Sequence, residues 1–82
     1  MVTLRLFAHL RELAGTGRVE IDADHVGAVL EEACKRFGAG FADGLRSASI
    51  WIDGEPFEGG ADQAVTKGSE VAIIPPVSGG SG

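Results

Sequence analysis

The chain has 82 residues, the length of one small domain. Hydrophobic residues make up 44% of it and charged residues 23%, a balance typical of a globular protein and not of a disordered one. Twelve acidic and seven basic side chains give a net charge of −5, which argues against a nucleic-acid-binding surface. No apolar run approaches the roughly 18 residues of a membrane span, so we expect a cytoplasmic protein that does not bind membranes.

The first third of the sequence predicts two strands joined by a short helix. Residues 2–8 (VTLRLFA) alternate between apolar and mostly polar positions, a period of two that indicates a strand with one buried face. The next residues have leucines at helical spacing and end at Gly15, which favours a short helix. Residues 18–22 (RVEID) alternate again, so we expect a second strand antiparallel to the first.

Residues 25–38 contain the clearest helical pattern. Six apolar side chains from Val26 to Phe37 recur every three or four residues and form one stripe. We expect Asp24 to cap the first turn, because its carboxylate can accept a hydrogen bond from an unpaired N–H. We expect Gly38 to end the helix. The stripe is interpreted as a packing face without a catalytic role.

The rest of the chain predicts a connection, a hairpin and a last strand. Residues 38–47 are punctuated by glycine and indicate a connection with a single helical turn. Residues 48–54 (ASIWIDG) predict a third strand that ends in an Asp-Gly turn, followed by a short edge strand around Phe57. Residues 69–76 (SEVAIIPP) predict the last strand.

These elements predict a two-layer α+β domain. One main helix would cover one face of a mixed sheet, with the first and last strands side by side in its centre. We assign residues 1–76 to this domain and residues 77–82 to a flexible Gly/Ser-rich C-terminal tail.

The end of the sequence, IIPPVSGGSG, cannot form a packed element. Pro75 and Pro76 fix φ and lack N–H donors, so they would end the strand and direct the chain away from the sheet. From Val77 to Gly80 an extended chain reaches at most ~14 Å. Because glycine has no Cβ, such a tail fits a narrow channel in a partner protein.

Two segments resemble a known family. LRLFAHLRELAG at residues 4–15 and GSEVAIIPPVSGG at residues 68–80 are similar to the MoaD/ThiS family of ubiquitin-like sulfur carriers, above all to the small subunits of molybdopterin synthase. The resemblance extends from Val2 to Gly80 and implies a ubiquitin-like β-grasp fold.

The resemblance also implies a function. A ubiquitin-activating-like adenylyltransferase would use ATP to adenylate the carboxylate of Gly80, which follows Gly79, and a sulfur donor would convert it to a thiocarboxylate. The molybdopterin synthase large subunit would take up the tail and pass the sulfur to cyclic pyranopterin monophosphate. The chain would be a non-catalytic carrier that binds no cofactor and no metal. The tail residues expected to contact partners are Pro75, Pro76, Val77 and Ser78.

Ser81 and Gly82 depart from the family pattern, whose members often end at Gly-Gly. A processing protease would remove them, or they are not native, or Gly82 itself reacts. We favour trimming or a variant carrier.

Other functions stay open. The chain would be a sulfur carrier for thiamine, cysteine or another sulfur-containing metabolite, a protein modifier that joins Gly80 to lysines, or a non-covalent β-grasp binding module.

The alternation of side chains along the strands predicts a second candidate site, a partner-binding surface on the sheet. If the helix covers the face that bears the buried leucines, then Phe7, Trp51 and Ile74 lie on the opposite face, close to the start of the tail. An exposed group of large apolar side chains is typical of a protein interface. The alternative is that Phe41 or Phe57 folds over this face and covers it.

The histidines and the cysteine give no signal for a metal site. His9 and His25 lie in different predicted elements, without nearby ligands at metal-binding spacing. Cys34 is the only cysteine and lies on the apolar stripe of the main helix, where packing is the expected role.

Overall fold

The first and last strands form the centre of the sheet. In the computed structural model, which describes residues 1–76, five strands pair in the order β2-β1-β5-β3-β4. The strands are β1 (Val2–Leu6), β2 (Arg18–Ile21), β3 (Ser49–Ile52), β4 (Glu55–Pro56) and β5 (Glu70–Ile74). The helices are α1 (Ala8–Ala14), α2 (Val26–Phe37) and α3 (Ala39–Leu45). No helix in this part of the chain is both long and apolar enough to cross a membrane.

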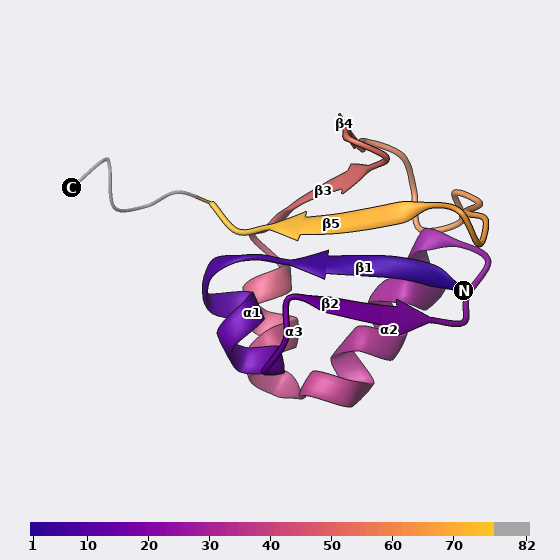
Figure 1. Cartoon of the computed structure of the whole chain (residues 1–82). Helices are drawn as coiled ribbons and strands as arrows, with labels where there is room; N and C mark the ends of the chain where they lie inside the picture. Colours follow the sequence, from indigo (N-terminus) through magenta and orange to yellow (C-terminus); the bar gives the residue numbers. More distant parts are fainter. Residues whose placement is uncertain (77–82) are drawn as a thin grey trace.

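The pairing confirms the predicted mixed sheet. β1 and β5 are parallel, with Leu4 beside Val71 and Leu6 beside Ile73. The other pairs, β1 with β2, β3 with β5 and β3 with β4, are antiparallel. The carboxyl ends of β1 and β5 therefore lie at the same end of the sheet, where Figure 1 shows the chain leaving the domain.

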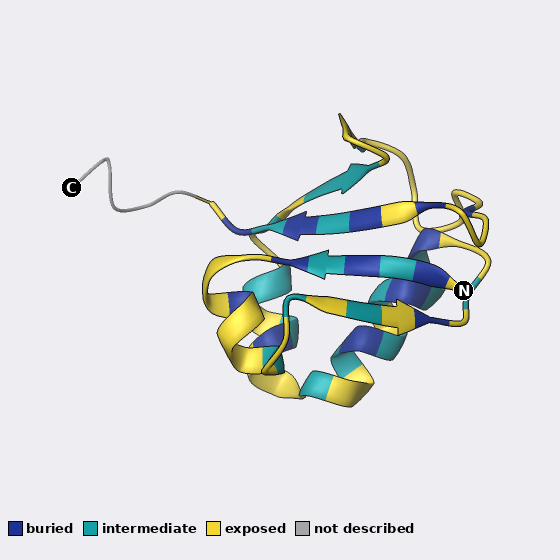
Figure 2. Cartoon of the chain, in the orientation of Figure 1, coloured by how far each residue is buried: buried dark blue, intermediate teal, exposed yellow. Residues whose placement is uncertain are grey.

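The core lies between the sheet and the helices. Every second residue of β1 and β5 is buried, in agreement with the predicted alternation. All three helices lie on one side of the sheet (Figure 1), and buried residues occur both in the central strands and in the helices (Figure 2), where they form one core cluster. This is the expected two-layer α+β architecture with the ubiquitin-like β-grasp topology. The fully buried side chains include Leu4, Leu6, Leu10, Val29, Phe41, Val71 and Ile73.

The connection after α2 is more helical than predicted. Gly38 has a φ of 89° and ends α2 as expected, but the chain then forms α3, a helix of seven residues instead of one turn. Phe41 explains the difference, because its side chain is fully buried and the centroid of its ring lies 5.1 Å from the centroid of the Phe37 ring. Tertiary packing thus stabilises a helix whose two glycines have low helical propensity.

The predicted Asp24 cap of α2 is wrong. His25 is the N-cap residue and makes no side-chain capping hydrogen bond. The Asp24 carboxylate instead lies 2.7 Å from Nδ1 of His25, and this hydrogen bond lowers the pKa of Asp24.

A loop that is distant in the sequence caps the start of α2. The N–H groups of Val26 and Gly27 donate to the carbonyl oxygens of Gln63 (2.9 Å) and Ala61 (2.7 Å). These bonds satisfy two donors that the first turn of a helix leaves unpaired. The loop before β5 therefore binds the start of α2, a contact that local sequence rules do not reveal.

The β3–β4 hairpin confirms the predicted Asp-Gly turn. Asp53 and Gly54 both have positive φ values, 51° and 84°, as a two-residue turn of type I′ requires. The edge strand was expected around Phe57, whereas β4 is limited to Glu55–Pro56. The Phe57 N–H still donates to the Ile50 carbonyl at 2.8 Å, so the pairing continues past the strand.

Two glycines of α3 provide a test of the packing between α1 and α3. A Cβ at Gly44 would lie 2.8 Å from Cδ2 of the buried Leu10 and 2.9 Å from Nε2 of His9, whereas a Cβ at Gly40 would meet nothing closer than 3.9 Å. We expect Gly44→Ala to lower the free energy of unfolding by about 1–3 kcal/mol through overpacking. We expect Gly40→Ala to raise it by roughly 0.5–1 kcal/mol through helix propensity. Urea unfolding measures both variants, and an equal gain in both would contradict close packing at Gly44.

Candidate functional site

The tail begins at the centre of the sheet. β5 ends at Ile74, and the following Pro75 is buried while Pro76 is exposed. Because β1 and β5 are parallel, Phe7, which directly follows β1, lies at the same end of the sheet as these prolines. The predicted site residues Val77, Ser78, Gly79 and Gly80 lie outside the described residues, so their roles stay predictions.

One face of the sheet carries no helix (Figure 1). On this face Trp51 lies between Pro56 of β4 and Ala72 of β5, and Arg5 of β1 lies on the other side of Ala72. Two residues further along β5, toward the tail, Ile74 is paired with Ser49 of β3. We call this surface the open face; its residues are Arg5, Phe7, Ser49, Trp51, Pro56, Ala72 and Ile74.

The three large apolar residues that parity placed on the open face are accessible there. Phe7 is 38% exposed, and Trp51 and Ile74 are half-buried. The guanidinium carbon of Arg5 lies 5.8 Å from the centroid of the Phe7 ring, so a cation–π contact holds Phe7 beside the strand residues. An ion pair with Glu70 (3.5 Å) positions Arg5 in turn.

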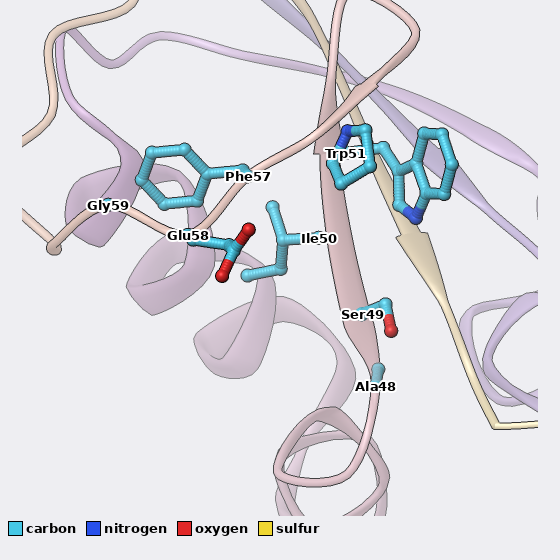
Figure 3. Close-up of a pocket in the computed structure, with 8 residues that line it drawn as sticks. Ala48, Ser49, Ile50, Trp51, Phe57, Glu58 and Gly59 are labelled. Carbon is cyan, nitrogen blue, oxygen red and sulfur yellow. The ribbon is translucent and has the colours of Figure 1, made fainter.

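The alternative in which Phe41 or Phe57 covers the open face is wrong. Phe41 belongs to α3 and is fully buried in the core. Phe57 packs against the same core. In Figure 3 the side chains of Phe57 and Ile50 lie on one side of β3, whereas Trp51 points to the other side. The open face is therefore not shielded by either ring.

A hollow of about 390 Å³ adjoins β3 at the edge of the sheet. It is lined by Ala48, Ser49, Ile50, Trp51, Pro56, Phe57, Glu58 and Gly59 (Figure 3). Glu58 is the only titratable side chain among them. Most of the other lining residues are apolar, so the hollow offers a contact surface.

The described residues also offer no metal ligands in a cluster. Within residues 1–76 no group of three His, Cys, Asp or Glu side chains is placed to hold a metal ion. Burial raises the pKa of the Cys34 thiol, which disfavours the nucleophilic thiolate.

The family comparison covers nearly the whole sequence. The model of the ThiS family matches residues 4–80, which is more than nine-tenths of the chain and includes both segments at the two ends of the sequence. The chain belongs to the ThiS family. It therefore has the ubiquitin-like fold of the MoaD/ThiS sulfur carriers, as the sequence motifs implied.

Solved structures agree with this assignment. The ThiS-family chain is similar to SAMP1, the small archaeal modifier protein 1 of Haloferax volcanii, with 30% identity, a TM-score of 0.75 and coverage of 95% of this chain and 97% of that one. A putative molybdopterin converting factor subunit 1 from Pyrococcus furiosus has 28% identity, a TM-score of 0.77 and coverage of 93% and 97%. The BexX/CysO complex of Amycolatopsis orientalis contains a chain with 24% identity, a TM-score of 0.80 and coverage of 96% and 99%, which shows the shared fold. No curated protein matches the chain.

The sequence interpretation missed part of the open face of the ThiS-family chain. Arg5 has the same strand parity as Phe7, but alternation alone does not single out an arginine whose contacts with Phe7 and Glu70 organise the site. Pro56 was not considered either, since its place opposite Trp51 depends on the hairpin register. The Asp-Gly turn was the available signal, because a two-residue hairpin loop fixes which residues face each other.

The different environments of two phenylalanines test whether Phe7 belongs to the surface and not to the core. Phe7 is the N-cap residue of α1 and has an extended backbone, a position where aspartate is favoured. We expect Phe7→Asp to change the free energy of unfolding by less than about 1 kcal/mol. Phe41→Ala should lower it by about 3–5 kcal/mol, because it empties a buried site. Chemical denaturation compares the two, and similar losses would show that Phe7 is a core residue.

Proposed function

We propose that this ThiS-family chain carries sulfur as a thiocarboxylate on Gly80 and serves in the cytoplasm as the small subunit of molybdopterin synthase. The observation that carries the proposal is the extent of the family match, which ends at Gly80 and leaves Ser81 and Gly82 outside. The match thus includes the diglycine and supports Gly80 as the residue that reacts. Removal of Ser81 and Gly82 by a processing protease is part of the proposal.

The chemistry requires activation by a second protein. A carboxylate is a poor electrophile, because its oxygen is a poor leaving group. In the proposed reaction a ubiquitin-activating-like adenylyltransferase transfers AMP from ATP to the Gly80 carboxylate and releases pyrophosphate. A sulfur nucleophile then attacks the acyl carbon and displaces AMP, so one difficult step becomes two easier ones. The chain needs no cofactor of its own.

The shape of the domain supports delivery of the tail to a partner. Pro75 is anchored in the domain and Pro76 is exposed, so the tail starts from a fixed point beside the open face. The half-buried Trp51 and Ile74 and the exposed Phe7 supply apolar anchors of the kind found in interfaces. The large subunit would dock on this face and take the tail into its interior. Similarity to the Pyrococcus converting factor subunit favours this partner.

A second candidate function is protein modification. The 30% identity to SAMP1, whose name describes a small archaeal modifier protein, favours it. In this case the activated Gly80 would form an amide with a lysine of a target protein instead of receiving sulfur. Carriers that serve another sulfur-containing metabolite share the first steps of the proposed reaction and differ only in the accepting enzyme.

Intact-mass measurement tests the carrier proposal. The chain ending at Gly80 should gain about 16 Da when incubated with ATP, the activating enzyme and a sulfur donor, because sulfur replaces one carboxylate oxygen. A chain truncated after Ser78 should gain nothing. Accumulation of conjugates with other proteins, without this gain, would favour the modifier, and an unchanged mass under all conditions would contradict activation of Gly80.

Oxidation of Met1 also adds about 16 Da, so the assay needs a chemical control. The variant Cys34→Ser removes the only thiol of the unmodified chain. A thiol-reactive alkylating reagent should then label the product only when ATP and the activating enzyme were present. Labelling without ATP would show that the gain in mass has another origin.

Two exposed apolar residues test the docking surface. We expect Phe7→Asp to weaken capture of the large subunit by at least about 30-fold, as loss of an interface hot spot does. Leu13→Asp places the same charge on α1, on the helical side of the sheet, at a residue that is 49% exposed. Its affinity should stay within about 3-fold of the unmodified chain. Equal weakening by both substitutions, measured by isothermal titration calorimetry, would contradict docking through the open face.

A further inference from the structure

A basic hollow lies at the end of the sheet where the tail begins. It has a volume of about 350 Å³ and is lined by Arg5, Leu6, Phe7, Arg11, Thr16, Gly17 and Arg18. Three of the seven basic residues of a chain with a net charge of −5 thus surround one depression, and no acidic residue lines it. We call this depression the basic hollow.

The fold brings these arginines together against their mutual repulsion. Arg5 and Arg18 are directly opposite each other on β1 and β2, an arrangement that is unfavourable for like charges. Arg5 pairs with Glu70 at 3.5 Å and Arg18 with Glu20 at 3.6 Å, which offsets part of the charge.

Arg11 adds a charge that these ion pairs do not neutralise. A Cβ on Gly17 would lie 3.2 Å from Nε of Arg11, so the arginine side chain lies against this glycine. Within residues 1–76 no carboxylate lies within 4.0 Å of the Arg11 guanidinium. The basic hollow therefore keeps a net positive charge.

Charge is separated along the strand direction. β2 and β3 run antiparallel to β1 and β5, so both end at the far end of the sheet from the tail. The exposed carboxylates of Asp22 and Asp53 directly follow these two strands. Two exposed carboxylates thus lie at the end of the sheet opposite the basic hollow.

We infer that the basic hollow receives carboxylate side chains from an acidic segment at the mouth of the enzyme that takes up the tail. The identity of this enzyme rests on the proposed function. The net charge of −5 disfavours nucleic acid as the occupant. Arg5 and Arg18 have side chains that are 40% and 67% exposed, which suits contact with another protein surface better than enclosure of a small anion. The field of the hollow would direct the domain to approach tail-first.

Charge reversal separates this role from docking through the apolar open face. We expect the double variant Arg11→Glu, Arg18→Glu to associate with the large subunit at least about 10-fold more slowly at low ionic strength. The difference should shrink as salt rises, because the charges are exposed and screened. Stopped-flow association with the purified large subunit over a range of ionic strength measures the effect. Arg5 stays unchanged because it supports Phe7.

Two further double variants serve as controls. Lys35→Glu, Lys67→Glu changes the net charge by the same amount at exposed positions outside the basic hollow, and its association rate should stay within about 3-fold of the unmodified chain. Arg11→Lys, Arg18→Lys keeps the charge and should preserve the rate. Circular dichroism and urea unfolding establish that every variant is folded.

The outcomes distinguish this inference from the proposed function. The thiocarboxylate could form while the association rate does not depend on salt, Arg11 or Arg18. This result would overturn the inference about the basic hollow and leave the carrier proposal standing. If association depends on Arg11 and Arg18 but the chain gains no sulfur, the inference about the basic hollow is supported and the carrier proposal is overturned. Equal slowing by the arginine and lysine reversals would overturn the inference about the basic hollow. Absence of binding to the large subunit would overturn that inference and the proposed role as the small subunit of molybdopterin synthase.

Discussion

The parallel pairing of β1 with β5 is the constraint on which the rest of the structure depends. Both strands are central, and Leu4, Leu6, Val71 and Ile73 from them are almost completely buried. Because the two strands run in the same direction, the chain enters α1 and leaves β5 at the same end of the sheet. The two segments with the family resemblance, residues 4–15 and 68–80, are far apart in sequence and meet there. This pairing thus brings Phe7, Arg5 and the start of the tail into one region.

The strands and α2 were predictable because their signals are local. Alternation in β1, β2, β3 and β5 fixes which residues face the core, and the same parity correctly placed Trp51 and Ile74 on the open face. The helix α3 was underestimated because its stability comes from burial of Phe41 and not from its own propensity. The capping of α2 by Gln63 and Ala61 escaped prediction for the same reason: two backbone carbonyls from a loop replaced the expected Asp24 side chain. Local rules failed where a tertiary contact supplied the stabilising group.

The candidate site, too, has some residues that local signals predict and others that only tertiary structure brings together. Phe7 could be assigned from alternation, but the register of β1 with β2 was needed to bring Arg5 and Arg18 together, and the path of the loop after α1 was needed to bring Arg11. A sequence contains no direct signal for an arginine cluster whose members are separated by six or seven positions and belong to two strands and a helix. The net charge of −5 even argues against a basic site. Charge composition describes the whole chain, whereas recognition depends on the local arrangement.

In the proposed function, the apolar open face and the basic hollow would meet different physical requirements of a carrier that binds more than one enzyme in turn. Apolar contacts at Phe7, Trp51 and Ile74 act only at short range and mainly determine how long a complex lasts. Charges act over about 10 Å at moderate ionic strength and mainly determine how often productive encounters occur. A carrier that binds too long blocks its own transfer to the next enzyme, so raising the association rate is preferable to strengthening the contact. Phe7 and Arg5 contact each other and belong to both surfaces, so a partner attracted by the charges would meet the apolar residues at the same place.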